Sequence, residues 1–192
     1  MVITMKRILF AFFALILFCT SVQVNAVQDY SKITTKPKLI AALESLESIN
    51  RRDVIAILNG RNATKKPIRV MFRDLRVMGY DDCEAVTMKT RDGGLIIYIN
   101  AQHRSASPEC IACLLAHESQ HHTFTNTKAE ELKAWVSEAQ AWNEFSKRNK
   151  NLLTSSEPLA KRENYIARIK SSGGIIGIQK LIAANPVYSN LN

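Results

Sequence analysis

The chain has only one long apolar run, and that run lies at its N-terminus. No later stretch approaches the roughly 20 apolar residues that a helix needs to span a bilayer, which excludes a polytopic membrane protein. Internal repeats and low-complexity tracts are also missing. The 46% of apolar residues excludes a disordered or collagen-like chain. The 192 residues are therefore long enough to enclose a hydrophobic core of ordinary size.

The sequence also lacks the patterns of nucleic-acid-binding proteins. No RNP-like, helix-turn-helix or zinc-finger motif is present. There are 26 Lys and Arg against 17 Asp and Glu, but the basic residues are scattered rather than clustered. We therefore expect no nucleic-acid partner, and the positive charge is only a weak indication of anionic surfaces or substrates.

The N-terminal apolar run is typical of a secretory signal peptide, residues 1–26. Lys6 and Arg7 form a basic region, residues 8–18 are apolar, and a small-residue cleavage pattern ends at Ala26. Cleavage would leave residues 27–192 as one domain with a formal charge of +7, because the leader holds two of the basic residues and no acidic one. We expect an exported protein, periplasmic or secreted, with a membrane anchor only where the leader stays uncleaved.

Cysteines are few, and once the leader is removed only Cys83, Cys110 and Cys113 remain. An oxidising compartment favours one disulfide among them, and the sequence does not select the pair. Cys110 and Cys113 also form a Cys-x-x-Cys motif in the first turns of a predicted helix, where the pKa of a thiol is lowered. A thiol–disulfide redox protein is therefore one alternative function, although the neighbouring elements do not follow the βαβ order of a thioredoxin-like fold.

Hydrophobic periodicity and turn signals predict an α+β fold, with a few short strands followed by helices. Strands are expected at residues 68–72, 84–90 and 95–99, the last two joined as a hairpin by a Gly-Gly turn. Helices are expected at residues 38–49, 53–58, 108–122, 127–147, 157–169 and 175–184. We expect the first two helices to be an integral part of the fold rather than a pro-segment.

Three of the four histidines fall in one six-residue stretch, 117–122, at the end of the helix predicted at 108–122. His117 and His121 are four residues apart, a rotation of about 40° on an α-helix, so both imidazoles project from one face and can reach a tetrahedral Zn²⁺. Glu118 then lies beside the metal, where its carboxylate can take a proton from a bound water. His122 is rotated by about 100° more and is not expected to be a ligand.

A third protein ligand is expected from a glutamate on the next helix. The short connection forces the two helices antiparallel, which places Glu131, in the first turn, beside the two histidines. Glu138 lies about two turns, or ~10 Å, further away and is the reserve candidate. Glu130 and Glu144 are expected on the far side, with Glu130 occupied by a capping box that begins at Thr127.

The His-Glu-x-x-His sequence that ends at His121, followed by Glu131-x-x-Ala134, resembles the gluzincin branch of the zincin metallopeptidases. The resemblance covers roughly residues 68–142, although the spacing from His121 to Glu131 is shorter than in the large gluzincin enzymes. The chain is most similar to small exported bacterial proteins of this metallopeptidase type. The metzincin class is excluded, because Phe124 and Thr127 stand where it requires a glycine and a histidine.

The resemblance implies a zincin-like fold and one Zn²⁺ per chain, held by His117, His121 and Glu131. It also implies that zinc-bound water attacks a carbonyl of a peptide or protein substrate, with Glu118 as general base and then general acid. The strand at 95–99 would be the edge strand that binds the substrate backbone. A zincin-like module that binds metal without cleaving remains a second alternative function.

Enzymes of this family often add a Tyr or His donor that stabilises the oxyanion. His103, Tyr165 and Tyr188 are available for this role, and the sequence does not rank them. Trp135 and Trp142 are interpreted as core residues rather than as a platform for substrate.

Overall fold

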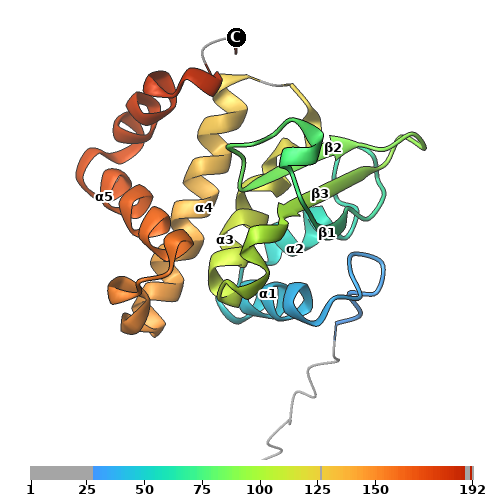
Figure 1. Ribbon diagram of the computed structural model, residues 1–192, viewed down its shortest axis with the longest axis horizontal. Coiled ribbons are helices and arrows are strands. Elements are labelled where there is room, and N and C mark those ends of the chain that lie inside the picture. Colours follow the sequence, from blue (N-terminus) through green and yellow to red (C-terminus); the bar gives the residue numbers. More distant parts are fainter. Residues whose placement is uncertain (1–27, 126, 189–190, 192) are drawn as a thin grey trace, which may run out of the picture.

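The computed structural model describes residues 28–125, 127–188 and 191, and it has the expected α+β architecture (Figure 1). The predicted signal peptide lies outside the described residues. Among the helices that are described, none is both long and apolar enough to cross a membrane. In chain order the elements are α1 (Pro37–Ser48), α2 (Arg52–Leu58), β1 (Arg69–Arg73), η1 (Arg76–Met78), β2 (Ala85–Lys89), β3 (Leu95–Asn100), η2 (Ala101–Ser105), α3 (Pro108–Glu118), η3 (Ser119–Thr123), α4 (Lys128–Arg148), η4 (Lys150–Thr154), α5 (Pro158–Ala184) and η5 (Pro186–Tyr188).

The three strands form a mixed sheet in the order β1-β3-β2. β2 and β3 form the predicted antiparallel hairpin, with Thr87 opposite Ile97, and Gly93 (φ +75°) supplies the left-handed residue of the turn. β1 pairs with the other edge of β3 in parallel. The expectation that residues 95–99 form an edge strand is therefore wrong. The reason is visible in the burial of β3, whose run of apolar residues is covered on both faces, as is typical of a central strand.

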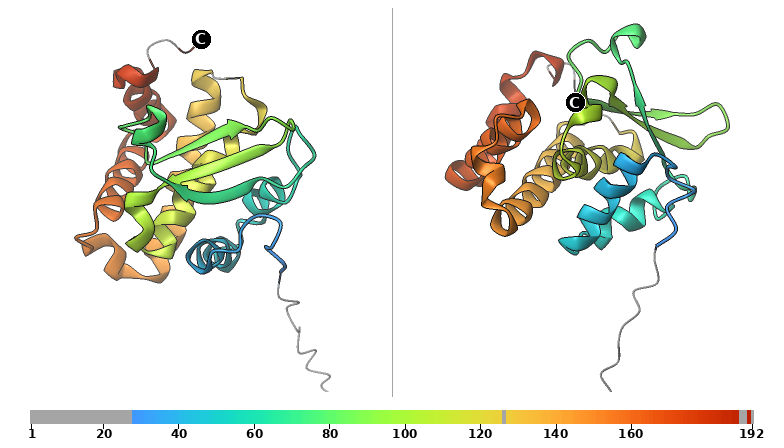
Figure 2. Two further views of the ribbon diagram at one scale, coloured as in Figure 1. Left: turned by 45° about the vertical axis from the view of Figure 1, so that its right-hand side comes forward. Right: turned by 60° about the horizontal axis from the view of Figure 1, so that its bottom comes forward.

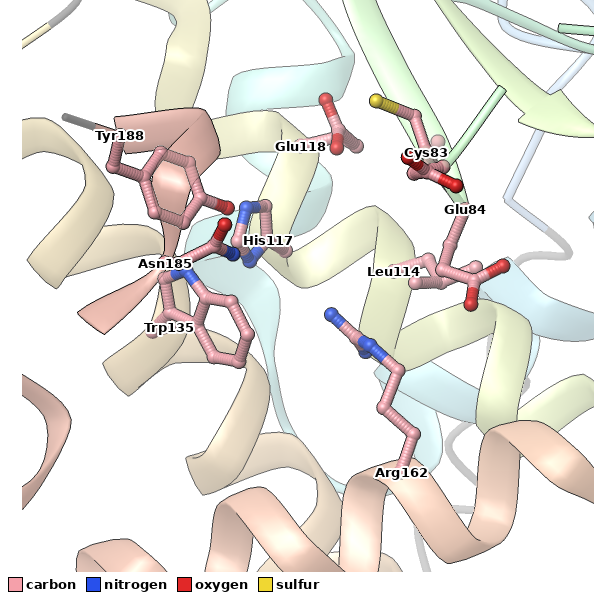
Figure 3. Close-up of a pocket in the computed structure, with 11 residues that line it drawn as sticks. Cys83, Glu84, Leu114, His117, Glu118, Trp135, Arg162, Asn185 and Tyr188 are labelled. Atoms are coloured by element: carbon pink, nitrogen blue, oxygen red, sulfur yellow. The ribbon is translucent and has the colours of Figure 1, made fainter. Parts of the chain in front are cut away.

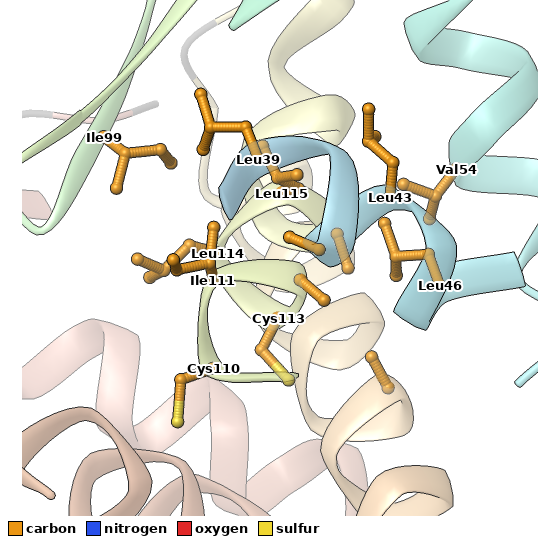
Figure 4. Close-up of a cluster of buried hydrophobic side chains, with 14 of the residues drawn as sticks. Leu39, Leu43, Leu46, Val54, Ile99, Cys110, Ile111, Cys113, Leu114 and Leu115 are labelled. Carbon is orange, nitrogen blue, oxygen red and sulfur yellow. The ribbon is translucent and has the colours of Figure 1, made fainter. Parts of the chain in front are cut away.

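The helices pack side by side, with α4 between α3 and α5 and with α1 on a further side of α3 (Figures 1 and 2). α3 is buried at every residue from Cys110 to Glu118. The main core gathers around it and includes Leu39, Leu43 and Leu46 of α1 (Figure 4). α1 therefore packs into the main core, and its assignment as an integral part of the fold rather than a pro-segment stays a prediction.

Side-chain caps fix where the two site helices begin. The Ser107 hydroxyl accepts a hydrogen bond from the Cys110 N–H (3.4 Å) at the start of α3, and the Thr127 hydroxyl accepts one from the Glu130 N–H (3.1 Å) at the start of α4. The helix predicted to reach residue 122 is shorter, because the chain tightens into the 3₁₀ helix η3 after Glu118 and ends in left-handed Phe124 (φ +55°). His117 and His121 therefore lie on two consecutive helical segments.

α5 covers both of the last two predicted helices. The chain bends within it at Gly174 (φ +57°, ψ −146°), where the sequence predicts a break (Figure 1). The segment after the bend folds back onto α4. There Ile178 and Ile182 join Trp135 and Ala139 in a second, smaller core.

Candidate metal centre

The side chains of His117, His121 and Glu131 converge between the end of α3 and the start of α4. His117 Nε2 lies 3.7 Å from Glu131 Oε2, and His121 Nε2 lies 3.6 Å from Glu131 Oε1. One ligand atom from each of the three residues lies within 4.8 Å of the others. Sequence reasoning expected this group, and the antiparallel packing of α3 and α4 brings it together.

The residues fit a metal ion in donor type and in spacing. Tetrahedral zinc bound to nitrogen and oxygen holds its ligand atoms about 3.3–3.5 Å apart, close to the two distances between the histidines and Glu131. Glu131 Oε2 is buried and makes no hydrogen bond, although a buried carboxylate oxygen normally has a partner. A cation at this point would satisfy it. The group could therefore hold a metal ion.

Each histidine has a second carboxylate on the far side of its ring. His117 Nδ1 lies 2.9 Å from Glu138 Oε2, and His121 Nδ1 lies 3.7 Å from Glu130 Oε2. A carboxylate on Nδ1 holds a metal-binding imidazole in the tautomer that leaves Nε2 free. Both Nε2 atoms face Glu131, so the two outer carboxylates orient the rings toward the same point.

These outer contacts correct two expectations from the sequence. Glu138 does not lie a further ~10 Å away but contacts His117 on the side opposite Glu131. Glu130 is not on the far side of α4. It is buried, with its carboxylate toward His121 and a hydrogen bond from the Thr123 hydroxyl. The reason is that η3 runs along the first turn of α4 and covers the side of that turn that carries Glu130.

The carboxylates around the site favour positive charge there. Burial lowers the pKa of His117, but the charges of Glu138, Glu118 and Glu131 outweigh it and raise the pKa overall. Burial and the neighbouring His117 lower the pKa of His121 to about 4, so that its ring is neutral at pH 7. One imidazole is thus ready to bind a metal, and a metal cation could replace the proton on the other.

Glu118 lies with His117 on the wall of a pocket of about 180 Å³ (Figure 3). Its Oε2 accepts a hydrogen bond from the Thr87 hydroxyl of β2 (2.8 Å). Burial raises the pKa of the Glu118 carboxyl, although His117 and Thr87 counteract it. A carboxylate with a raised pKa is a stronger base, which is what a general base requires.

Of the three donor candidates, only Tyr188 lines the pocket. Figure 3 shows its hydroxyl pointing toward the ring of His117. Burial raises the pKa of Tyr188, so the phenol keeps its proton and can donate it. His103 is instead hydrogen-bonded to Glu84, and Tyr165 is 55% exposed.

The two tryptophans differ in position. Trp142 is fully buried in the main core. Trp135 belongs to the second core but also lines the pocket, where its ring meets that of His117 edge-on at 5.6 Å. The interpretation of Trp135 as a core residue is therefore incomplete.

Cys83, Cys110 and Cys113 are free thiols, so the disulfide expected among them is not formed. Cys110 and Cys113 are buried, and burial raises the pKa of both thiols. The predicted effect of the helix N-terminus, a lowered thiol pKa, is therefore overridden by burial. Cys83 is half-buried and lies on the wall of the pocket.

Comparison of the chain with protein-family models, curated proteins and solved structures gave no match. The support for a metal site therefore comes from the geometry of its residues. Thr87 and Arg162, which also contact the site residues, were not predicted, since nothing in their sequence neighbourhoods marks them. The position of Glu138 near the site could have been predicted, because Glu138 lies seven residues after Glu131 and thus on the same face of α4.

Proposed function

We propose that this chain is an exported zinc-dependent metallopeptidase in which His117, His121 and Glu131 hold one Zn²⁺ and Glu118 is the general base. The observation that carries the proposal is the convergence of two imidazole nitrogens and one carboxylate beside a second, buried carboxylate on the wall of one pocket. Three protein ligands together with a nearby glutamate are the set that hydrolytic zinc sites use.

A zinc ion bound here would polarise the carbonyl of the substrate and lower the pKa of the attacking water. Glu118 accepts a proton from that water and passes it to the leaving amine. The Thr87 hydrogen bond holds the carboxylate in place during both transfers. Tyr188 donates its phenolic hydrogen to the developing oxyanion, because its hydroxyl points into the same pocket.

An extended substrate backbone has a strand edge available next to the site. β2 pairs with β3 on one side, and no other strand of the described residues pairs with its outer edge. Its first residue, Ala85, lines the pocket together with Cys83 and Glu84, which directly precede the strand. We assign substrate binding to this outer edge of β2, in place of the strand at 95–99, with main-chain hydrogen bonds extending the sheet.

The redox alternative is not favoured, because burial raises the pKa of both thiols of the Cys-x-x-Cys motif. The non-catalytic alternative differs from a peptidase only in whether peptides are cleaved.

The substitution Glu118→Gln tests the proposed reaction. It keeps the shape of the side chain but removes the base, so cleavage of a fluorogenic peptide library should fall by about 10²–10⁴-fold while zinc content stays unchanged. Glu109→Gln, the same change about two and a half turns earlier on α3, serves as the matched control and should keep full activity. Undiminished cleavage by the Glu118→Gln variant would contradict the mechanism, and a parent protein that binds zinc but cleaves nothing would favour the binding module.

A further inference from the structure

A chain of polar side chains leads from His117 into helix α5. Glu138 Oε2 lies 2.9 Å from His117 Nδ1, and the carboxylate of Glu138 accepts hydrogen bonds from both terminal nitrogens of Arg162. Arg162 also donates to Glu163 Oε1 (2.6 Å). Glu138 and Glu163 are fully buried, and the side chain of Arg162 is 25% exposed.

Helix packing alone does not account for this cluster. Taking polar and charged groups out of water is costly, and apolar residues of similar volume often replace buried ion pairs with no loss of stability. α4 and α5 already have an apolar contact, formed by Trp135 and Ala139 with residues of α5. Glu163 Oε2 is buried without a hydrogen bond, which adds a further cost.

The contacts of Arg162 converge on His117 from two directions. Its guanidinium holds Glu138, which contacts His117 Nδ1, and it lies over the ring of Trp135 at 5.3 Å. Trp135 in turn packs edge-on against the His117 ring. The guanidinium therefore restrains both neighbours of the imidazole, and Figure 3 shows it on the same pocket as His117.

We propose that Arg162 and Glu163 are positioning residues of the metal centre, an inference that rests on the metal site of the proposed function. Glu163 holds Arg162, and Arg162 fixes both oxygens of Glu138. Toward His117, the Glu138 carboxylate then acts as an acceptor for Nδ1–H, which leaves the lone pair of Nε2 facing Glu131. Helix α5, which supplies none of the three site residues, would thus affect how tightly the site between α3 and α4 binds a metal ion.

The experiment compares zinc dissociation constants of full-length variants, measured by competition with a chromophoric chelator. Arg162→Gln should bind zinc about 10–100-fold more weakly, the usual effect of losing a partner behind a ligand histidine. Arg162→Lys restores the charge but not the fork that grips both oxygens of Glu138, so it should recover only part of the affinity. The absorption spectrum of the cobalt-substituted Arg162→Gln protein should shift as well.

Asn164→Ala is the matched control. It removes another hydrogen bond between the same two helices, from Trp142 Nε1 to Asn164 Oδ1 (3.0 Å), that does not lead to the metal site. Its zinc affinity should stay within about threefold of the parent's, even where the melting temperature of the metal-free protein falls as much as in Arg162→Gln.

Equal zinc affinity in Arg162→Gln and the parent, or an equal loss in Asn164→Ala, would overturn the inference and leave a purely structural cluster. If Arg162→Gln does not fold, Arg162→Lys carries the test, with weaker zinc binding than in Asn164→Ala expected. A protein that shows this pattern of affinities but cleaves no peptide would contradict the peptidase and leave the positioning role intact.

Discussion

At the scale of single residues, some side chains of the site could be predicted from the sequence and others could not. The spacing of His117 and His121 follows from the pitch of a helix, and Glu131 follows from the short connection between two antiparallel helices. Thr87 is 31 residues from Glu118 in the sequence, and Arg162 is 24 residues from Glu138. Local pattern cannot place them, because their contacts depend on how β2 and α5 pack against α3 and α4.

Thr87→Val tests the hydrogen bond that holds Glu118. Valine has nearly the same shape but no hydroxyl. Loss of one hydrogen bond to a carboxylate costs about 1.4 kcal/mol, so kcat should fall about tenfold. Zinc content should not change. Thr87→Ser keeps the hydroxyl and should retain most of the activity, and equal losses in the two variants would contradict this role.

The cysteines provide a test of the redox alternative. A thiol reacts as its thiolate, and burial both raises the pKa of Cys110 and Cys113 and blocks access to them. In the native protein at pH 8, iodoacetamide should therefore modify the half-buried Cys83 first, as measured by mass spectrometry of tryptic peptides. Faster labelling of Cys110 or Cys113, or a disulfide between them, would favour the redox function instead.

At the scale of elements, the helices and strands themselves were predictable, but the order of the strands was not. Alternating and helical patterns predict each segment to within a few residues at its start. The position of β3 in the middle of the sheet depends on β1 pairing with it from the opposite side, which no local pattern reports. The early end of α3 was also missed, since its last turn tightens against α4.

The bend in α5 depends on a conformation that suits only glycine. Gly174 has φ +57° and ψ −146°, so Gly174→Ala should lower the free energy of unfolding by about 1–3 kcal/mol, measured by urea titration. Gly173→Ala is the matched control, because Gly173 has ordinary helical geometry and open space for a Cβ atom. That substitution should be neutral or slightly stabilising, and equal effects of the two would show that the bend is not constrained.

At the scale of the whole molecule, the α+β class and the meeting of the two site helices follow from the sequence. The site lies where the sheet, α3, α4, the start of α5 and η5 meet, and each contributes to the pocket. The contributions of Arg162 and Tyr188 depend on the course of α5 back along α4 (Figure 2), which brings both residues to the pocket that His117 lines. Export by the leader and the identity of the substrate stay predictions.

Zinc content by mass spectrometry tests the central claim most directly. The parent protein, supplied with zinc and then desalted, should carry about one zinc ion per chain. His121→Ala should lose it and Glu131→Ala should bind it more weakly. Their matched controls are His122→Ala, the neighbouring histidine outside the site, and Glu144→Ala, a half-exposed glutamate of the same helix as Glu131, and both should bind zinc as the parent does. A parent protein without zinc, or equal zinc loss in His122→Ala and His121→Ala, would contradict the account.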